Sequence, residues 1–104
     1  MAAYCFFDVR EVVDPAKMED YRRNVLATVE QYGGRYVVMG GTCDVIEGQW
    51  KPNFPVIIRF PSLEQAHNWY HSEEYKYLKA LRLSGSKCDA VFMESEPGEF
   101  VSES

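Results

Sequence analysis

The stretch GGRYVVMGGTCDVIEGQW, from Gly33 to Trp50, decides the fold of this chain. Its first glycine pair follows a run with helical spacing and predicts the end of a helix. The second pair, Gly40-Gly41, interrupts a run of strand-forming residues. It predicts a bulge or a sharp bend, because glycine accepts backbone angles that other residues avoid. Gly48 begins a turn that sends the chain back. These three events fix how a helix, a long bent strand and the following strand lie against one another.

The segment before this stretch predicts an amphipathic helix. Asp14 can accept hydrogen bonds from free backbone N–H groups, and Pro15 suits the first helical position because its missing N–H costs nothing there. Gly33 is a natural left-handed terminator. Apolar side chains recur at helical spacing in between: Met18, Tyr21, Val25, Val29 and Tyr32.

A second helix is predicted after Pro61. Ser62 and Gln65 have the spacing of a capping box, in which each side chain bonds the backbone of the other. Ser72 followed by two glutamates is typical of the N-cap of a new helix. We therefore expect the second helix to break there and another helical stretch to run to about Leu83. Ser84 to Ser86 is predicted to be a loop.

Runs rich in aromatic and β-branched residues predict the strands. They are Tyr4–Val13, Arg35–Met39 with its continuation Cys43–Glu47, Pro55–Phe60 and Cys88–Ser95. The order is β-α-β-β-α-β, an α+β fold of the ferredoxin-like kind, with a four-stranded antiparallel sheet and both helices on one face. We expect one domain over residues 1–95 and an acidic, mobile tail over residues 96–104.

Alternation assigns the two faces of the sheet. Phe7, Val56, Ile58 and Phe60 are predicted to lie under the helices. The opposite face receives apolar and charged side chains together: Phe6, Asp8, Arg10, Val37, Ile57 and Arg59. Such a face is too apolar to be simply exposed to water, so we expect a homodimer that packs these sheet faces together.

Composition narrows the classes of partner. The chain has 104 residues, a net charge of -5 and no run of Lys or Arg, so neither nucleic acid nor an anionic membrane is an expected partner. No apolar run approaches the roughly 20 residues that cross a bilayer, and no signal peptide is recognisable. The cysteines, odd in number and widely spaced, favour a reducing cytoplasm and small core positions: Cys5, Cys43 and Cys88.

Several short motifs together resemble a known family. They are Gly33-Gly34-Arg35-Tyr36, Gly40-Gly41, Glu47-Gly48-x-Trp50-x-Pro52, Phe60-Pro61-Ser62 and Trp69-Tyr70-x-Ser72-x-Glu74-Tyr75. The chain resembles, over Ala3 to Glu94, the bacterial domain of unknown function 1330 family of the dimeric α/β-barrel superfamily. The resemblance implies a ferredoxin-like protomer and a homodimer built by packing sheets face to face. That superfamily includes cofactor-free monooxygenases, lactone isomerases and haem-dependent chlorite dismutases, and fold alone does not select among them.

Charged side chains on the predicted strands give the sharpest functional signal. Arg35 and Arg59, together with Asp8 and Arg10, could meet a carboxylate through planar two-point hydrogen bonds. The alternative, which we favour, is an ion-pair network in the dimer interface. Asp8 is a weak candidate for a catalytic base.

A group of aromatic residues, three on the second predicted helix and one in the turn before the third strand, is the other candidate. Trp50, Trp69, Tyr70 and Tyr75 could line a pocket between helix and sheet, or could be ordinary core. A ligand there would have Arg35 as its first choice of polar anchor and Arg59 as its second. The predicted ligand-binding residues are therefore Arg35, Trp50, Arg59, Trp69 and Tyr70.

His67 and His71 stand four residues apart on a predicted helix and could bind a metal with Glu64 or Glu74. A solvated helix face is the favoured interpretation, so no metal site is expected, and His67 is kept only as a weak catalytic candidate. No cofactor motif is present, and no cofactor is expected. The functional expectation is a homodimer that binds a small, aromatic or carboxylate-bearing metabolite. It is either a cofactor-independent enzyme or a non-catalytic binding or dimerisation module.

Overall fold

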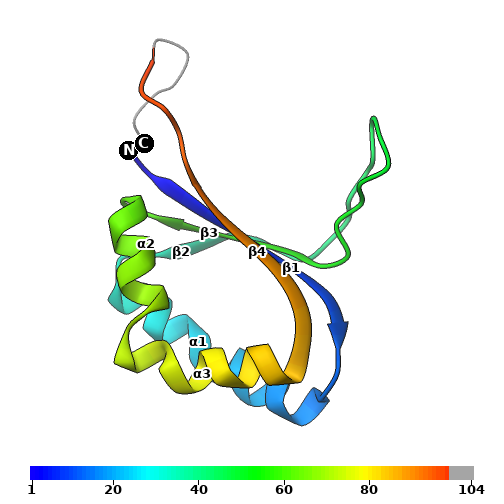
Figure 1. Ribbon diagram of the computed structural model, residues 1–104, viewed down its shortest axis with the longest axis vertical. Helices are drawn as coiled ribbons and strands as arrows, with labels where there is room; N and C mark the ends of the chain where they lie inside the picture. Colours follow the sequence, from blue (N-terminus) through cyan, green and yellow to red (C-terminus); the bar gives the residue numbers. More distant parts are fainter. Residues whose placement is uncertain (99–104) are drawn as a thin grey trace.

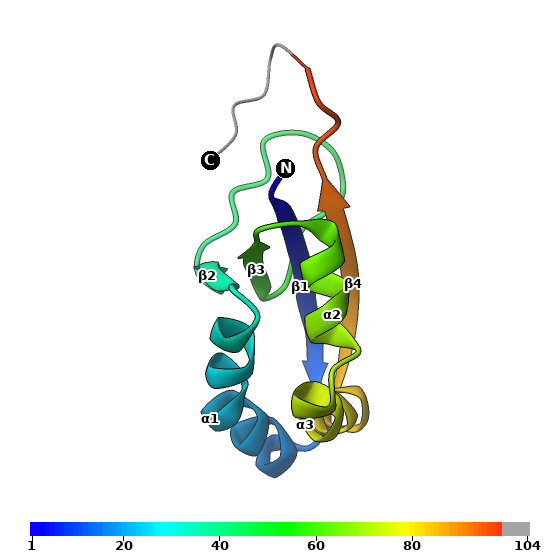
Figure 2. The ribbon, with the colours of Figure 1, turned by 90° about the vertical axis from the view of Figure 1, so that its left-hand side faces the viewer.

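A computed structural model describes residues 1–98 and shows four strands and three helices. Their order is β1 (Ala3–Val12), α1 (Pro15–Gln31), β2 (Arg35–Met39), β3 (Pro55–Phe60), α2 (Leu63–Tyr70), α3 (Glu73–Gly85) and β4 (Ser86–Glu94). The strands form one antiparallel sheet in the order β2-β3-β1-β4. All three helices cover one face of it (Figures 1 and 2). The predicted ferredoxin-like α+β fold is confirmed. No helix within residues 1–98 is long and apolar enough to cross a membrane.

The predicted helix starts are present in the structure. The Asp14 carboxylate accepts hydrogen bonds from the backbone N–H groups of Ala16 (3.1 Å) and Lys17 (3.2 Å), and Pro15 occupies the first turn of α1. Helix α1 ends before Gly33, whose φ of 81° lies in the left-handed region. Local sequence therefore sets both ends of this helix.

The predicted break near Ser72 is also confirmed. The Ser62 hydroxyl accepts from the Gln65 N–H at the start of α2 (3.0 Å). At the start of α3 the Ser72 hydroxyl accepts from the Tyr75 N–H (3.1 Å) and donates to the Trp69 carbonyl (2.7 Å). One serine thus ends one helix and begins the next, which turns the aromatic residues on both sides of the break into the core.

The prediction that β2 resumes through Cys43–Glu47 is wrong. Pairing between β2 and β3 stops at Met39, opposite Val56, and residues 40–54 contain no strand. Gly40 and Gly41 both have positive φ, 68° and 99°, so the chain leaves the sheet instead of bulging within it. We call residues 40–54 the arm; it extends away from the body of the molecule (Figure 1).

The predicted loop at Ser84–Ser86 is also absent. Helix α3 runs to Gly85, and β4 begins at Ser86. A Cβ at Gly85 would lie 3.0 Å from Lys17 Cβ and 3.3 Å from Met18 Sδ, so this glycine permits close contact between α3 and α1. Its carbonyl accepts hydrogen bonds from the N–H groups of Val13 and Asp14. Glycine here serves packing between helices, which a sequence read locally cannot show.

The core lies between the helices and the sheet. Phe7, Ile58 and Phe60 are buried there as predicted, and Val56 is partly buried beside them. Cys5 is buried too, and burial raises the pKa of its thiol to about 12, so it is an inert core residue. Cys43 and Cys88 are only partly buried, so the core prediction holds for Cys5 alone.

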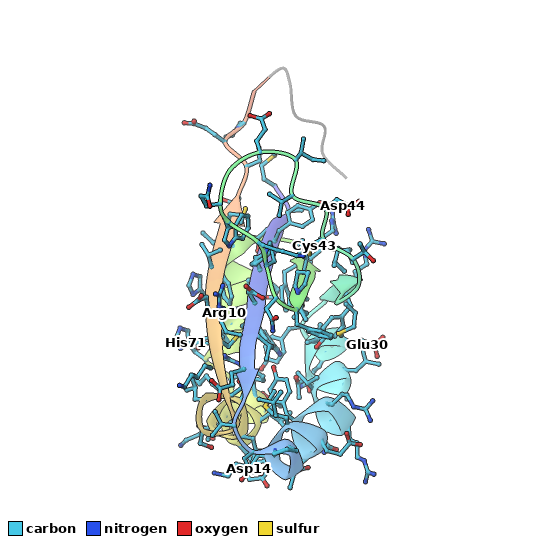
Figure 3. All side chains as sticks on the ribbon, turned by 90° about the vertical axis from the view of Figure 1, so that its right-hand side faces the viewer. Arg10, Asp14, Glu30, Cys43, Asp44 and His71 are labelled. Carbon is cyan, nitrogen blue, oxygen red and sulfur yellow. The ribbon has the colours of Figure 1, made fainter. Side chains whose placement is uncertain are left out.

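The opposite face of the sheet carries no helix (Figure 3). Cross-strand register places apolar side chains from all four strands on this helix-free face: Tyr4, Phe6, Val38, Ile57, Val91 and Met93. A register shift between Tyr36 and Val38 places Val38 opposite Ile57 and leaves Val37, predicted for this face, without a paired residue on β3. The face carries apolar and charged side chains together, as predicted from alternation, with Arg35 opposite Arg59 and Asp8 opposite Asp89.

Candidate functional site

A pocket of about 660 Å³ lies between α1 and the sheet. Its walls come from α1, from strands β1, β2 and β3, from the base of the arm and, through Arg82, from α3. Figure 2 shows α1 and α3 on the helix-covered side of the sheet, where the pocket lies. Pockets that hold small organic molecules commonly have volumes of about 300–1,000 Å³. The site is therefore large enough for a metabolite.

The lining of this pocket is mostly apolar. Phe7, Val25 and Ile58 are buried in its walls, whereas Leu26 and Met39 remain exposed at its edge. Apolar walls favour an apolar ligand body, since about 25 cal/mol is gained per Å² removed from water. The lining of the pocket therefore favours ligands with a largely apolar body.

Arg82 is the buried cation of the pocket. Its side chain is only 4% exposed. Nε donates to the Tyr75 hydroxyl (3.2 Å), and Nη2 donates to the Tyr70 hydroxyl (3.3 Å). The guanidinium carbon also lies 5.1 Å from the centre of the Phe7 ring. Within residues 1–98 no carboxylate forms an ion pair with Arg82.

Two phenols extend this polar group toward the pocket. The hydroxyls of Tyr21 and Tyr75 share a hydrogen bond of 2.8 Å, and Tyr21 lines the pocket together with Tyr36. Burial raises the pKa of the hydroxyls of Tyr21, Tyr75 and Tyr36, so these phenols stay protonated near neutral pH. Burial lowers the pKa of Arg82, but Tyr75, Tyr21 and Cys88 together raise the pKa above its ordinary value. The cluster presents hydrogen-bond donors and one permanent positive charge.

The structure does not bring the predicted aromatic residues together around one pocket. Trp69 is completely buried in the core, where its ring centre lies 4.1 Å from that of Tyr75 and its Nε1 donates to Thr28 Oγ1 (3.0 Å). Trp50 is 66% exposed on the arm and contacts Phe6 of the helix-free face (5.8 Å between ring centres). The favoured alternative, core packing, describes the geometry of Trp69 but not that of Trp50.

The predicted arginine anchors lie away from the larger pocket. Arg35 and Arg59 are directly opposite each other on β2 and β3, on the helix-free face, and neither lines the pocket. None of the five predicted ligand-binding residues lines it, although Tyr70 reaches it indirectly by accepting from Arg82. A ligand role for Arg35 or Arg59 stays a prediction.

Asp8 has a structural task that the sequence did not reveal. Its carboxylate is 2% exposed and accepts hydrogen bonds from the backbone N–H groups of Asn53 (2.9 Å) and Phe54 (2.8 Å). Arg10 donates to the second oxygen at 3.3 Å. Asp8 therefore holds the base of the arm, where Asn53 and Phe54 line the pocket. An ion pair between Asp8 and Arg10 is thus present within one protomer, whereas the ion-pair network in a dimer interface and a catalytic role for Asp8 stay predictions.

His67 lines a second, smaller pocket of about 400 Å³ at the edge of α2 and β4. Its ring stacks on that of His71 (5.9 Å, 5° between planes) and packs against Phe92 (5.4 Å). Across the described residues, no three His, Cys, Asp or Glu side chains are close enough to hold a metal ion. The two exposed histidines thus form a stacked ring contact at the end of α2, and a catalytic role for His67 stays a prediction.

Sequence reasoning missed Arg82, although a signal was available. The buried positions of α3 are Tyr75, Leu78, Arg82 and Gly85, a spacing of one helix face. An arginine on the apolar stripe of an amphipathic helix must be buried, and buried charges are rare without a special reason. That pattern could have identified Arg82 before the structure did.

Comparison with known proteins places the chain within one family. A family model described as a domain of unknown function (DUF1330) matches residues 2–95. No curated protein is similar enough in sequence to match.

Several solved structures share the fold. The RPA0582 protein of unknown function from Rhodopseudomonas palustris has a TM-score of 0.71 at 15% identity, over 93% of this chain and 84% of that chain. SnoaB, a cofactor-independent oxygenase from Streptomyces nogalater, has a TM-score of 0.55 at 13% identity, over 94% of each chain. An uncharacterized NIPSNAP domain protein from Burkholderia xenovorans has a TM-score of 0.53 at 14% identity, over 98% of this chain and 99% of that chain. At these identities the similarity demonstrates a shared fold.

Proposed function

The chain belongs to the DUF1330 family, and we propose that it is a homodimeric protein that binds a small, aromatic or carboxylate-bearing metabolite in the pocket between α1 and the sheet. The observation that carries this proposal is the mostly apolar pocket of about 660 Å³ with one buried cation, Arg82. Neither catalytic candidate from the sequence, Asp8 or His67, lines that pocket. Binding of a ligand in this pocket therefore requires no catalytic residue, whereas catalysis there would require one other than Asp8 or His67.

The proposal is tested with a bulky substitution at the edge of the pocket. Leu26 lines the pocket and is exposed, so Leu26→Trp can fill the entrance without disturbing the buried core. A library of small aromatic and aliphatic acids, and their neutral analogues, is first screened by thermal unfolding. A compound present at a hundred times its Kd stabilises the protein by about 2.7 kcal/mol, which raises Tm by roughly 10 °C in a domain of this size. We expect Leu26→Trp to weaken each compound found at least about ten-fold, a change of about 1.4 kcal/mol.

The matched control is Leu83→Trp, because Leu83 is exposed on α3 and does not line the pocket. The Leu83→Trp protein should bind each compound with a Kd within about two-fold of that measured for the unmodified protein. Equal binding by Leu26→Trp and the unmodified protein would place the compounds elsewhere and refute this site.

The proposed dimer uses the helix-free face. Tyr4, Val91 and Met93 are exposed on it, between one third and one half of their surface, beside partly buried Phe6. Exposed Asp89 on β4 and Arg10 on β1 give the same face both signs of charge, which a two-fold interface can pair between copies. Packing two copies together would cover this apolar surface.

A charge at the centre of this surface should weaken the dimer. Val91 is 51% exposed and lies opposite Phe6 in the sheet. Val91→Asp would bury an unpaired carboxylate in the interface, so we expect the dimer dissociation constant to rise at least about ten-fold. Sedimentation equilibrium measures it, with Leu83→Asp on the helix side as the control. A monomeric unmodified protein at micromolar concentration would refute the dimer.

A cofactor-independent enzyme is the second candidate. The observation in its favour is the Tyr21–Tyr75 phenol pair beside Arg82, which could donate a proton to, and stabilise, a developing oxyanion. The fold is shared with the oxygenase SnoaB, and that likeness alone supplies no reaction. Mass spectrometry of each bound compound after incubation in air separates the candidates, since only an enzyme converts it.

The cellular location stays a prediction. All three cysteines are free thiols, which agrees with the predicted cytoplasmic location.

A further inference from the structure

Arg82 lacks the partner that a buried charge normally has. It is 4% exposed, yet its partners carry no charge: it donates hydrogen bonds to the phenols of Tyr75 and Tyr70, and it also interacts with the Cys88 thiol. No carboxylate within the described residues pairs with it. An uncompensated charge in a low-dielectric interior is costly, and structures retain such charges where a ligand or another group completes them.

The phenols beside Arg82 add donors rather than acceptors. Guanidinium N–H groups can only donate, so the Tyr75 oxygen accepts from Arg82 Nε. One hydrogen serves the bond between Tyr75 and Tyr21, and the pair carries two. When Tyr75 donates to Tyr21, the phenolic hydrogen of Tyr21 remains for a third group. Tyr21 and Arg82 both line the pocket, so that group can be a ligand.

The geometry points to an anion subsite: we propose that Arg82 and the Tyr21–Tyr75 pair together receive one carboxylate, carried by an otherwise apolar molecule whose body lies along Val25, Leu26 and Ile58. This inference rests on the proposed function, because it uses the same pocket. It adds the class of ligand, an amphiphilic monocarboxylate, and its orientation, with the acid against α3. A planar carboxylate suits a guanidinium because both offer two parallel hydrogen-bonding positions.

The surrounding walls restrict the ligand to a single charge. The remaining charged side chains in the lining are Glu11 and Arg22, and both already have partners, Lys87 and Glu19. The rest of the lining is mostly apolar and includes the buried side chains of Phe7, Val25 and Ile58. A second carboxylate on the ligand would lie against these apolar groups and lose its water without compensation. Dicarboxylates should therefore bind worse than monocarboxylates of equal size.

The test uses pairs of probes that differ only in charge: 2-naphthoate with 2-naphthamide, and octanoate with octanamide. Isothermal titration calorimetry measures their affinities for the full chain. In the unmodified protein at least one acid should bind about ten-fold or more tightly than its amide. Arg82→Met keeps an unbranched side chain over Phe7 and removes the charge, so the preference for the acid should disappear while the amide still binds.

Two further arginine variants complete the comparison. Arg23→Met removes an exposed arginine of α1 that does not line the pocket, and should keep the preference for the acid. Arg35→Met tests the anchor expected from sequence; loss of the preference there, with Arg82→Met unaffected, would overturn the assignment to Arg82. If Arg82→Met does not fold, as judged by circular dichroism, the charge comparison in the unmodified protein and an Arg82→Lys variant decide. Lysine keeps the charge but loses the two-point geometry, so the preference should fall without disappearing.

The outcomes separate this inference from the proposed function. Amides that bind as well as acids to the unmodified protein would overturn the anion subsite and leave an apolar binding pocket intact. No binding by either probe pair, in this experiment and in the screen, would overturn both. A diacid such as 2,6-naphthalenedicarboxylate that binds more tightly than 2-naphthoate would overturn the single-charge restriction.

Discussion

Replacing Trp69 by alanine should lower the free energy of unfolding by about 3–5 kcal/mol. The side chain is fully buried, packs against Phe60 and Tyr75, and donates a hydrogen bond to Thr28 on α1. Its removal would leave a cavity between α2 and the sheet, and the Thr28 hydroxyl would keep only its hydrogen bond to the Val25 carbonyl. Domains of this size have total stabilities of about 5–15 kcal/mol, so this one change would remove a large share. Urea unfolding followed by circular dichroism measures it.

The second tryptophan is the control. Trp50 is 66% exposed, and its described ring contact is with Phe6. Trp50→Ala should cost less than about 1 kcal/mol. Equal losses for the two variants would contradict the assignment of Trp69 to the core and Trp50 to the surface.

Asp8→Ala should destabilise the protein by about 3 kcal/mol, because one buried carboxylate serves three donors. Two are the backbone N–H groups of Asn53 and Phe54, and the third is Arg10. Without Asp8 the base of the arm would keep only the bonds from the Asn53 side chain to the carbonyls of Val9 and Arg10 and the bond from the Val9 N–H to the Phe54 carbonyl. Urea unfolding measures the loss, and hydrogen exchange should show lost protection at the amides of Asn53 and Phe54. Ligand affinity should fall as well, since both residues line the pocket.

Asp89 provides the matched control for this change. It is exposed on β4, directly opposite Asp8. Like charges at opposed positions repel, so Asp89→Ala should change stability by no more than about 0.5 kcal/mol. An Asp8→Ala protein as stable as Asp89→Ala would show that the arm is held by other contacts.

The sequence predicts some walls of the candidate site, but it predicts neither the position of the pocket nor its buried cation. Tyr21 was assigned to the buried stripe of α1, and Ile58 to the helix-covered face of the sheet. Arg82 was overlooked, although its place on the α3 stripe marks it as buried. Alternation correctly assigns Arg59 to the helix-free face, and Arg35 lies directly opposite it, so both predicted anchors are away from the larger pocket. Alternation gives the face a side chain occupies, but not where the cavity is.

The sequence by itself determined the elements and their order. The caps at Asp14, Ser62 and Ser72 join atoms two or three residues apart, so their hydrogen bonds form wherever the local chain allows. Alternation and helical spacing then assign buried faces, because the periods of strand and helix are fixed by backbone geometry. The predicted domain over residues 1–95 stays a prediction, as does the tail over residues 96–104, of which residues 99–104 lie outside the described residues.

Only the tertiary structure determines the path of the arm, the hydrogen bonds of Asp8 and the position of the pocket. Asp8 and Asn53 are 45 residues apart, and Tyr21 and Tyr75 are 54 apart, so no local pattern brings them together. Such contacts exist only after the helices have packed on the sheet, because packing offsets the entropy cost of closing these long loops. The same packing leaves Arg82 buried beside an open apolar space without a carboxylate partner among the described residues. Local interactions set the elements, and long-range packing set the site.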